Sequence, residues 1–299
     1  MTGRAVVIGD ALIDELRDTG GVREFVGGAA LNVAVGLSRL GVPSSLIAMV
    51  GDDEAGDRIR SYLDDYGVEL IATVGPHGSS RAVSIRSASG EPTYEFNDAA
   101  WNRAVDFAER ERAAIADAAI VVVSCFPFDD LAQTAALAEA AGGSRLAIDP
   151  NPRSGMLHDR ERFVTGFESV VPGATLAKVG EDDAALLYGE PLDLLRTRLI
   201  DLGAEAVLAT YGSSGAAIDA GQDAVTAPIS GFPGRIVDTM GGGDAAFAST
   251  IASLLAGRDD WSAVLHEAMD VAAATCRFEG ALLRLPSALE RIDIDAIGT

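Results

Sequence analysis

Residues 238–244 have the sequence DTMGGGD and lead into a run of small apolar residues, 245–255. Three consecutive glycines can turn bare backbone N–H groups toward a ligand, because no Cβ holds the ligand away. The apolar run predicts a buried helix, and a helix N-terminus attracts anions through its free N–H groups and its dipole. The stretch therefore predicts an anion site. Asp244 beside it is either a base that takes a proton next to a phosphoryl group or an ordinary helix N-cap.

Composition sets limits on the partners of the chain. Its 299 residues are 48% hydrophobic, enough to bury a large core, and the formal net charge is −22. Such a charge repels nucleic acid and anionic membranes, so we expect neither as a partner. Two cysteines provide no disulfide framework, and the first residues contain no apolar run long enough for a signal peptide or membrane span. We expect a cytoplasmic protein.

Short apolar runs alternate with helical patterns through most of the chain. This rhythm predicts an α/β fold with a mostly parallel sheet, helices on both faces and ligands at the carboxyl ends of the strands. Two shorter alternating pieces near the end of the series predict antiparallel edge strands. The expected buried strands are 4–9, 44–50, 120–124, 145–149, 176–179 and 204–210, and the edge strands are 216–219 and 224–226.

Two further segments alternate apolar and polar residues, which indicates strands with one solvated face. Residues 12–26 alternate around a glycine turn, and residues 82–86 and 93–96 are separated by turn-forming residues at 89–92. We expect these strands to form a small sheet apart from the main one. Such a sheet is a candidate lid.

Polar residues collect where the predicted strands end, and each has two interpretations. Asp10 and Asp14 suit the hydroxyl groups of a polyol, or they are a turn residue and a solvated charge. Asn32 is unfavourable inside a helix, so it either caps locally or reaches a ligand beside Gly28.

Two more loops have the same ambiguity. The loop with Thr210, Gly212 and Gly215 could hold a base or a phosphate, or it is an ordinary turn. The acids that begin the helix at Glu181 could stabilise its dipole without any further role. The three histidines show no metal-ligand spacing.

Together, in this order, these features resemble the ribokinase-like sugar kinases of the phosphofructokinase B family. The resemblance covers essentially the whole chain and is closest to the fructokinase-like members. It implies a single domain, 1–299, with a three-layer α/β/α architecture and a small β-sheet lid whose strands come from about 12–26 and 81–97. The motifs that carry it are 27–34 (GGAALNVA) with Gly41 and Gly51, and 238–244 (DTMGGGD), supported by 9–14 (GDALID), 149–153 (DPNPR) and 210–215 (TYGSSG).

The resemblance also implies residue roles. Asp244 would be the catalytic base, and the glycine loop before it would be the anion hole for the transferred phosphoryl group. Sugar hydroxyls and the nucleotide would bind at two further sets of residues. The glycine loop is Gly241, Gly242 and Gly243; the sugar set is Asp10, Asp14, Gly28 and Asn32; the nucleotide set is Thr210, Gly212 and Gly215.

ATP and Mg²⁺ are the implied cofactors. Where the family carries Asn-x-x-Glu, this chain has GEDD at 180–183, so we expect Glu181 or Asp183 to organise Mg²⁺ through water. A monovalent cation such as K⁺ could bind to the backbone around Asp238 and Met240 with the loop 278–280.

The expected activity is ATP-dependent phosphorylation of a sugar hydroxyl, with fructose the leading substrate. Ribose, 2-keto-3-deoxygluconate and nucleosides are alternatives, as is a binding protein on the same fold without turnover. A carboxylated sugar would favour an arginine near the second lid hairpin, and none occurs between Thr93 and Ala100. A Rossmann dehydrogenase is disfavoured because Gly9 is not followed by G-x-G-x-x-G spacing. A half-exposed lid sheet would be a natural homodimer surface.

Overall fold

The computed structural model describes residues 3–18, 21–86 and 92–289. Nine strands of this part of the chain form one large sheet in the order β13-β12-β11-β10-β9-β8-β1-β4-β5. They are β1 (Ala5–Gly9), β4 (Ser44–Val50), β5 (Glu69–Val74), β8 (Ile120–Ser124), β9 (Leu146–Asp149), β10 (Leu176–Gly180), β11 (Ala206–Thr210), β12 (Ala216–Ala220) and β13 (Asp223–Ala227).

The seven strands from β11 to β5 are parallel, and β12 and β13 form an antiparallel edge. The chain builds outward from β1 through β4 and β5, then returns to the other side of β1 with β8. Strand order therefore reverses between β1 and β8, and open α/β sheets bind ligands outside the carboxyl ends of the strands at such a point. Gly9 pairs with Ser124, and Ser124 pairs with Asp149, so three strand ends meet at this edge.

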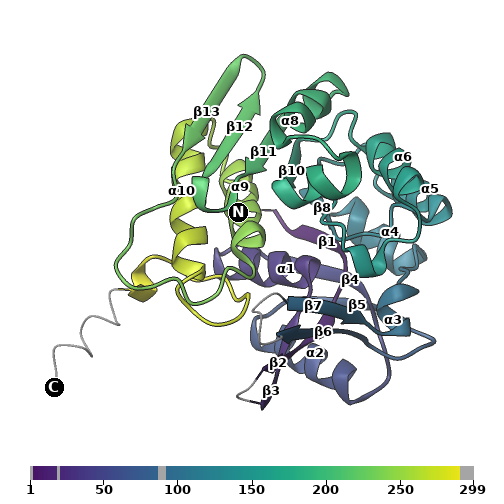
Figure 1. Cartoon of the computed structure of the whole chain (residues 1–299). Helices are drawn as coiled ribbons and strands as arrows, with labels where there is room; N and C mark the ends of the chain where they lie inside the picture. The colour runs from purple at the N-terminus through teal and green to yellow at the C-terminus, as the bar shows by residue number, and fades with distance from the viewer. Residues whose placement is uncertain (1–2, 19–20, 87–91, 290–299) are drawn as a thin grey trace, which may run out of the picture.

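Helices cover both faces of the sheet (Figure 1). Because successive side chains of a strand point to opposite faces, Val7 of β1 joins one core cluster while Val6 and Ile8 join the other. One face is covered by α1 (Ala29–Arg39), α2 (Glu54–Asp65), α9 (Gly242–Leu255) and α10 (Trp261–Thr275), and the other by α4 (Glu109–Ala116), α5 (Leu131–Ala140), α6 (Arg160–Val170) and α8 (Leu192–Asp201). Short helical turns connect these elements: α3 (Asp98–Trp101), η1 (Ser154–Met156), α7 (Glu181–Asp183), η2 (Ala184–Tyr188) and η3 (Gly212–Ser214).

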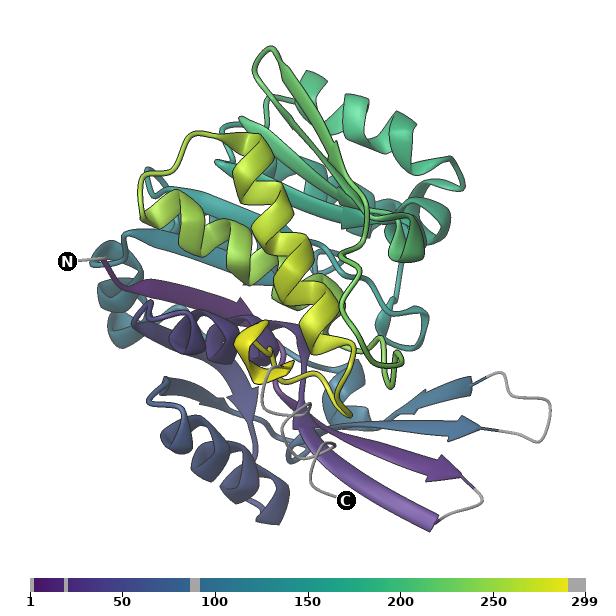
Figure 2. The same cartoon turned by 90° about the vertical axis from the view of Figure 1, so that its left-hand side faces the viewer.

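A second sheet of four strands projects from the main body (Figure 2). Its order is β3-β2-β6-β7, with β2 parallel to β6 and the two outer pairs antiparallel. The strands are β2 (Leu12–Asp18), β3 (Gly21–Gly27), β6 (Ser80–Arg86) and β7 (Pro92–Phe96). The predicted fold class, a mostly parallel sheet covered on both faces plus a small sheet, is confirmed.

One strand of the main sheet was not predicted from the sequence. The pattern changes character from about residue 68, but β5 pairs with β4 as a parallel edge strand. As an edge strand, β5 is incompletely covered: Ile71 is buried, and its other residues are partly or fully exposed. In the turn expected at 89–92, residues 89–91 lie outside the described residues, and Pro92 begins β7. Among the described residues, no helix has the length and apolar character needed to cross a membrane.

Candidate active site

The glycine loop begins in a backbone conformation that requires glycine. Gly241 is the N-cap of α9 and has a φ of +74°. A Cβ on this residue would lie 2.6 Å from the carbonyl oxygen of Ala281, so a side chain is excluded by both conformation and space. The loop is thereby fixed at the start of a 14-residue helix, where the first backbone N–H groups have no partner within the helix. That of Gly242 donates to the carbonyl of Thr239 at 3.3 Å. This arrangement can bind an anion.

Asp244 lies in the first turn of α9, directly after the glycine loop. The N-cap is Gly241 and no side chain caps this helix, so the N-cap interpretation of Asp244 is wrong. The carboxylate is 8% exposed, and its Oδ2 accepts a hydrogen bond of 2.8 Å from Nδ2 of Asn32 on α1. Burial raises the pKa of Asp244, against the opposing effects of the Lys178 charge and the Asn32 hydrogen bond. A buried carboxylate beside an anion site can accept a proton from a bound hydroxyl.

Asp10 follows β1 and lies at the N-terminus of α1. Its Oδ1 accepts a hydrogen bond of 3.0 Å from the backbone N–H of Ala30. Gly28, with a φ of +112°, packs so closely that a Cβ would lie 2.9 Å from the Asp10 carbonyl oxygen. Burial raises the pKa of Asp10, partly offset by the Ala30 N–H and the charge of Arg103.

Asp14 lies on β2 of the small sheet and is close enough to Asp10 and Asp244 to be affected by their charges. Burial and the negative charges of Asp10 and Asp244 raise the pKa of Asp14 to about 7. The charges of Asp10 and Asp244 act on Asp14, Gly28 packs against Asp10, and Asn32 is bonded to Asp244. The structure therefore brings the four predicted sugar-binding residues together around Asp244. They come from four different segments: the end of β1, β2, the loop before α1, and α1 itself.

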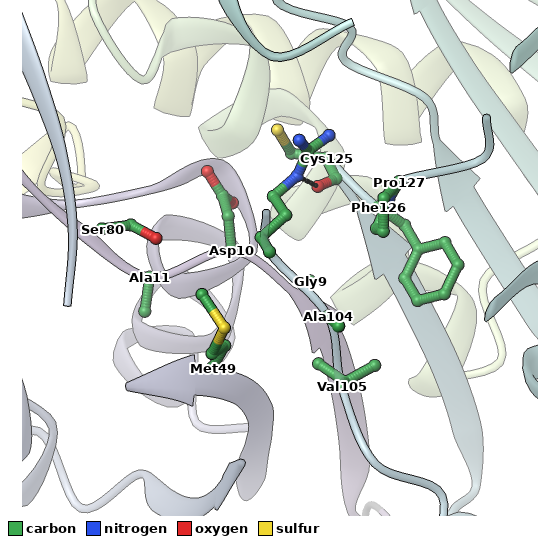
Figure 3. Close-up of a pocket in the computed structure, with 11 residues that line it drawn as sticks. Gly9, Asp10, Ala11, Met49, Ser80, Ala104, Val105, Cys125, Phe126 and Pro127 are labelled. Atoms are coloured by element: carbon green, nitrogen blue, oxygen red, sulfur yellow. Dashed lines mark hydrogen bonds between the residues drawn. The ribbon is translucent and has the colours of Figure 1, made fainter. Parts of the chain in front are cut away.

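A small cavity lies on one side of Asp10 (Figure 3). Its volume is about 10 Å³, room for about one water molecule and not for a sugar. Buried Arg103 lines it, and its guanidinium donates to the backbone carbonyls of Cys125, Ala100 and Met156. Arg103 therefore ties three chain segments together beneath the site. The thiol of Cys125 is buried beside Asp10, and both effects raise its pKa.

A buried ion pair lies beside the glycine loop. Nζ of Lys178 on β10 donates to Oδ2 of Asp149 on β9 at 3.0 Å, with almost no exposure of either side chain. A Cβ on Gly243 would lie 3.3 Å from this Nζ, so the ammonium group sits against the glycine loop. Lys178 was not predicted from the sequence, although a lysine in the middle of an otherwise buried apolar strand is itself a signal.

Arg153, four residues beyond the end of β9, adds a further cation. Burial acts to lower the pKa of its guanidinium, but Cys125 and the carboxylates of Asp244 and Asp10 more than reverse this, and the pKa is raised. The residue thus lies within the field of the same acids that surround the glycine loop. It remains charged at any physiological pH.

The predicted nucleotide residues form a closed loop after β11. The backbone N–H of Tyr211 donates to the carbonyl of Gly215 at 2.8 Å. The hydroxyl of Thr210 approaches to 3.2 Å of where a Cβ on Gly180 would lie, and Gly212 lies near the carboxylate of Glu181. The structure therefore places the predicted nucleotide loop beside the predicted metal segment.

The metal segment offers few protein ligands. Oδ2 of Asp183 accepts the backbone N–H of Gly180 at 2.6 Å, and burial raises the Asp183 pKa. In the described part of the chain, no group of three acidic, histidine or cysteine side chains could hold a metal ion. Mg²⁺ is commonly held by one or two carboxylates with several waters and substrate phosphates. Glu181 and Asp183 fit that mode, in which most ligands are not protein atoms.

The two segments expected to hold a monovalent cation are adjacent. Asp238 accepts hydrogen bonds from the backbone N–H groups of Met240 (3.0 Å) and Gly280 (3.2 Å). The carboxylate thereby joins the start of the glycine loop to the segment after α10.

Comparison with known proteins identifies the family. Residues 3–288 match the model of the pfkB family of carbohydrate kinases. A fructokinase from Klebsiella pneumoniae is 30% identical over 96% of this chain and 97% of its own length. An ATP-dependent 6-phosphofructokinase from Thermoanaerobacterium thermosaccharolyticum is 24% identical over 98% of this chain and 92% of its own length.

Solved structures share the fold. A fructokinase from Xylella fastidiosa with bound ATP superimposes with a TM-score of 0.80 at 20% identity, covering 99% of this chain and all of the other. A fructokinase double mutant from Vibrio cholerae, in a form with fructose, ADP and potassium ion bound, has a TM-score of 0.74 at 23% identity and covers 97% and 98% of the two chains. The chain belongs to the pfkB family of carbohydrate kinases, and it is an ATP-dependent phosphotransferase that acts on sugars.

Proposed function

We propose that this pfkB-family kinase transfers the γ-phosphoryl group of ATP to a hydroxyl of fructose or a similar neutral sugar, with Asp244 as general base. One observation carries the proposal: the carboxylate of Asp244 is buried directly after the glycine loop and bonded to Asn32 of the sugar-binding set. A base must lie within reach of both the acceptor hydroxyl and the phosphoryl group.

In the proposed reaction, Asp244 takes the proton of the sugar hydroxyl while the oxygen of that hydroxyl bonds to the γ-phosphorus of ATP. The bond from that phosphorus to the bridging oxygen breaks, and ADP leaves with the electron pair. The backbone N–H of Gly243 would donate to the phosphoryl oxygens, and that of Gly242, which donates to the carbonyl of Thr239 in this structure, could join it by turning away from Thr239. The dipole of α9 also stabilises the phosphoryl charge. Phosphoryl transfer depends mostly on such positioning and charge stabilisation.

The charges of the proposed sugar site favour a neutral substrate. In their ionised forms, Asp10 and Asp14 would repel a carboxylate or the phosphate of a phosphorylated sugar, and Arg103 already donates to three backbone carbonyls. Carboxylate oxygens accept hydrogen bonds well from sugar hydroxyls. The fructokinase relative supports fructose in particular, and the 6-phosphofructokinase relative makes fructose 6-phosphate the informative competitor.

Cofactor positions follow from the same segments. Thr210, Gly212 and Gly215 would line the nucleotide, and Glu181 and Asp183 would hold the waters of Mg²⁺. Bound Mg²⁺ would neutralise charge on the ATP phosphates. A potassium ion would fit near the carbonyls of the segments that Asp238 joins, and a potassium ion is bound in one fructokinase structure of the same fold.

The small sheet is proposed as a lid and dimer surface. Asp14 of β2 reaches the site, so closure of this sheet would cover the sugar and exclude water. Val22 on β3 is 62% exposed, which suits a contact with a second copy of the chain. Light scattering of the purified protein, with and without sugar, would measure the oligomeric state.

The test is an ADP-release assay with ATP and Mg²⁺ across fructose, fructose 6-phosphate, ribose, 2-keto-3-deoxygluconate and adenosine. We expect kcat/KM to be highest for fructose and at least about tenfold lower for fructose 6-phosphate, since one unfavourable charge contact costs on the order of 1.4 kcal/mol. Preference for fructose 6-phosphate or for 2-keto-3-deoxygluconate would contradict the neutral-sugar assignment. No turnover on any of the five would contradict the proposed function.

A further inference from the structure

Lys178 is the only lysine of the chain. Lysine and arginine together number 23, so every other basic side chain is an arginine. A chain that otherwise uses arginine throughout has a lysine at a buried position of β10, where the space is confined. The position beside Gly243 accommodates a compact ammonium group, whereas a guanidinium is larger and planar.

The surroundings of this ammonium group leave part of its bonding capacity free. An ammonium group has three donors, and among the described residues Lys178 makes one hydrogen bond, to Asp149. Oδ1 of Asp149 is buried without a partner in the structure. The pair is therefore incompletely satisfied on both sides, at the point where it meets the glycine loop. Structural ion pairs in a core tend to have their remaining donors and acceptors occupied.

We propose that Lys178 is a positioning residue that holds Asp244 in its carboxylate form beside the glycine loop, with Asp149 keeping the ammonium group in place. This inference rests on the proposed role of Asp244 as base. Burial alone would favour the protonated acid, which cannot accept a proton from a sugar. The opposing positive charge comes mainly from Lys178.

Several other groups act on Asp244, and the effect of Lys178 must be separated from theirs. Arg153 and the Asn32 hydrogen bond also favour the carboxylate, while nearby acids disfavour it. The groups around Asp244 are Lys178 on β10, Asp149 at the end of β9, Arg153 in the loop after it, Asp10 after β1, Asp14 on β2 and Asn32 on α1. The charge of Asp183 also acts on Lys178.

The inference predicts opposite effects for the two partners of the ion pair. Lys178→Met removes the positive charge, so the acidic limb of kcat/KM against pH should move up by about one unit or more and kcat should fall by about 10²-fold. Asp149→Asn removes a negative charge and leaves Lys178 in place, so the acidic limb should move down. A purely structural pair would give no opposite shifts. An unmoved limb in Lys178→Met, or shifts of the same sign in both variants, would overturn the inference.

The double variant Lys178→Met/Asp149→Asn distinguishes the proposed effect on Asp244 from a simple loss of folding. It leaves neither charge buried without a partner, so we expect a melting temperature near that of the wild type. We expect its kcat to stay at least about tenfold low and its acidic limb to lie between those of the single variants. Wild-type rate and pH profile in a double variant that melts normally would overturn the inference.

A spectroscopic readout separates this inference from the proposed function. Since the chain has one lysine, labelling with lysine ¹³C-enriched at Cε gives a single NMR signal from Lys178. Its shift should show a pH step that is absent in Asp244→Asn and retained in both Asp149→Asn and Asp183→Asn, the variants of the two other carboxylates whose charges act on Lys178. If this pH step is observed in a protein that turns over no sugar, the inference is upheld and the kinase proposal fails. Turnover without the step would overturn the inference and leave the kinase proposal standing.

Discussion

Asn32 and Asp244 are 212 residues apart in the sequence, and their side chains are joined by a hydrogen bond of 2.8 Å. The bond connects α1, which begins beside the proposed sugar-binding acids, to α9, which begins at the glycine loop. It orients the carboxylate and opposes its protonation. One contact thus links the proposed acceptor site to the proposed phosphoryl site.

Asn32→Ala tests that link. The variant removes a hydrogen bond to a charged group, worth roughly 1.5–3 kcal/mol, so kcat/KM should fall by about 10- to 100-fold. Since the bond favours the ionised form, its loss raises the pKa of Asp244, and the acidic limb of the pH profile should move up. Asn102→Ala is a control, because Asn102 is exposed and bonds only to the carbonyl of Asp98 among the described residues. An Asn32→Ala enzyme with the wild-type pH profile would contradict this role.

Gly241→Ala tests the backbone requirement of the glycine loop. A matched control is Gly257, which has nearly the same φ (+73° against +74°) but has no atom within 4 Å of the position that a Cβ would take. Gly257→Ala should cost only about 1 kcal/mol of unfolding free energy, the cost of the conformation. Gly241→Ala also meets the Ala281 carbonyl oxygen, so it should cost at least about 1 kcal/mol more. Urea unfolding measures both, and equal losses would show that the loop tolerates a side chain.

Asp14→Asn should change how stability depends on pH. The folded-state pKa of about 7 lies above the ordinary value of 3.8, so the folded protein holds the proton more tightly than the unfolded chain. Stability from this group is present below about pH 4 and is lost as pH rises toward 7. The melting temperature of the variant relative to wild type should therefore increase from pH 4 to pH 7 and stay constant above. A constant difference across that range would contradict the raised pKa.

Asp183→Asn tests the metal segment. The variant can still accept the Gly180 N–H through its amide oxygen, so the start of α7 should be preserved. Loss of the carboxylate should raise the Mg²⁺ concentration for half-maximal rate by about tenfold. Asp182→Asn, which changes an exposed neighbour, should leave it unchanged. Equal Mg²⁺ dependence of the two variants would place the metal elsewhere.

Sequence patterns located the main elements of the site because its strand ends and glycine loops are local features. The glycines at 241–243 and the buried run after them were enough to predict the start of α9, and Asn32 was marked by its poor helix propensity. The Asn32–Asp244 bond could not be predicted, because periodicity indicates which face of a helix is buried but not which distant helix packs against that face. Lys178 was missed for a related reason: its partner, Asp149, belongs to a neighbouring strand 29 residues away. Pairing of strands, and hence of these charges, is a property of the folded sheet.

The most direct test of the proposed mechanism is the kcat of Asp244→Asn on the best sugar substrate. The amide is nearly isosteric and can still accept the bond from Asn32, so binding of ATP and sugar should remain within about threefold of wild type, the size of a small change in a hydrogen bond. Loss of the base should lower kcat by about 10²–10⁴-fold. A folded Asp244→Asn protein that retains more than about a tenth of the wild-type kcat would contradict the assignment of Asp244 as the general base.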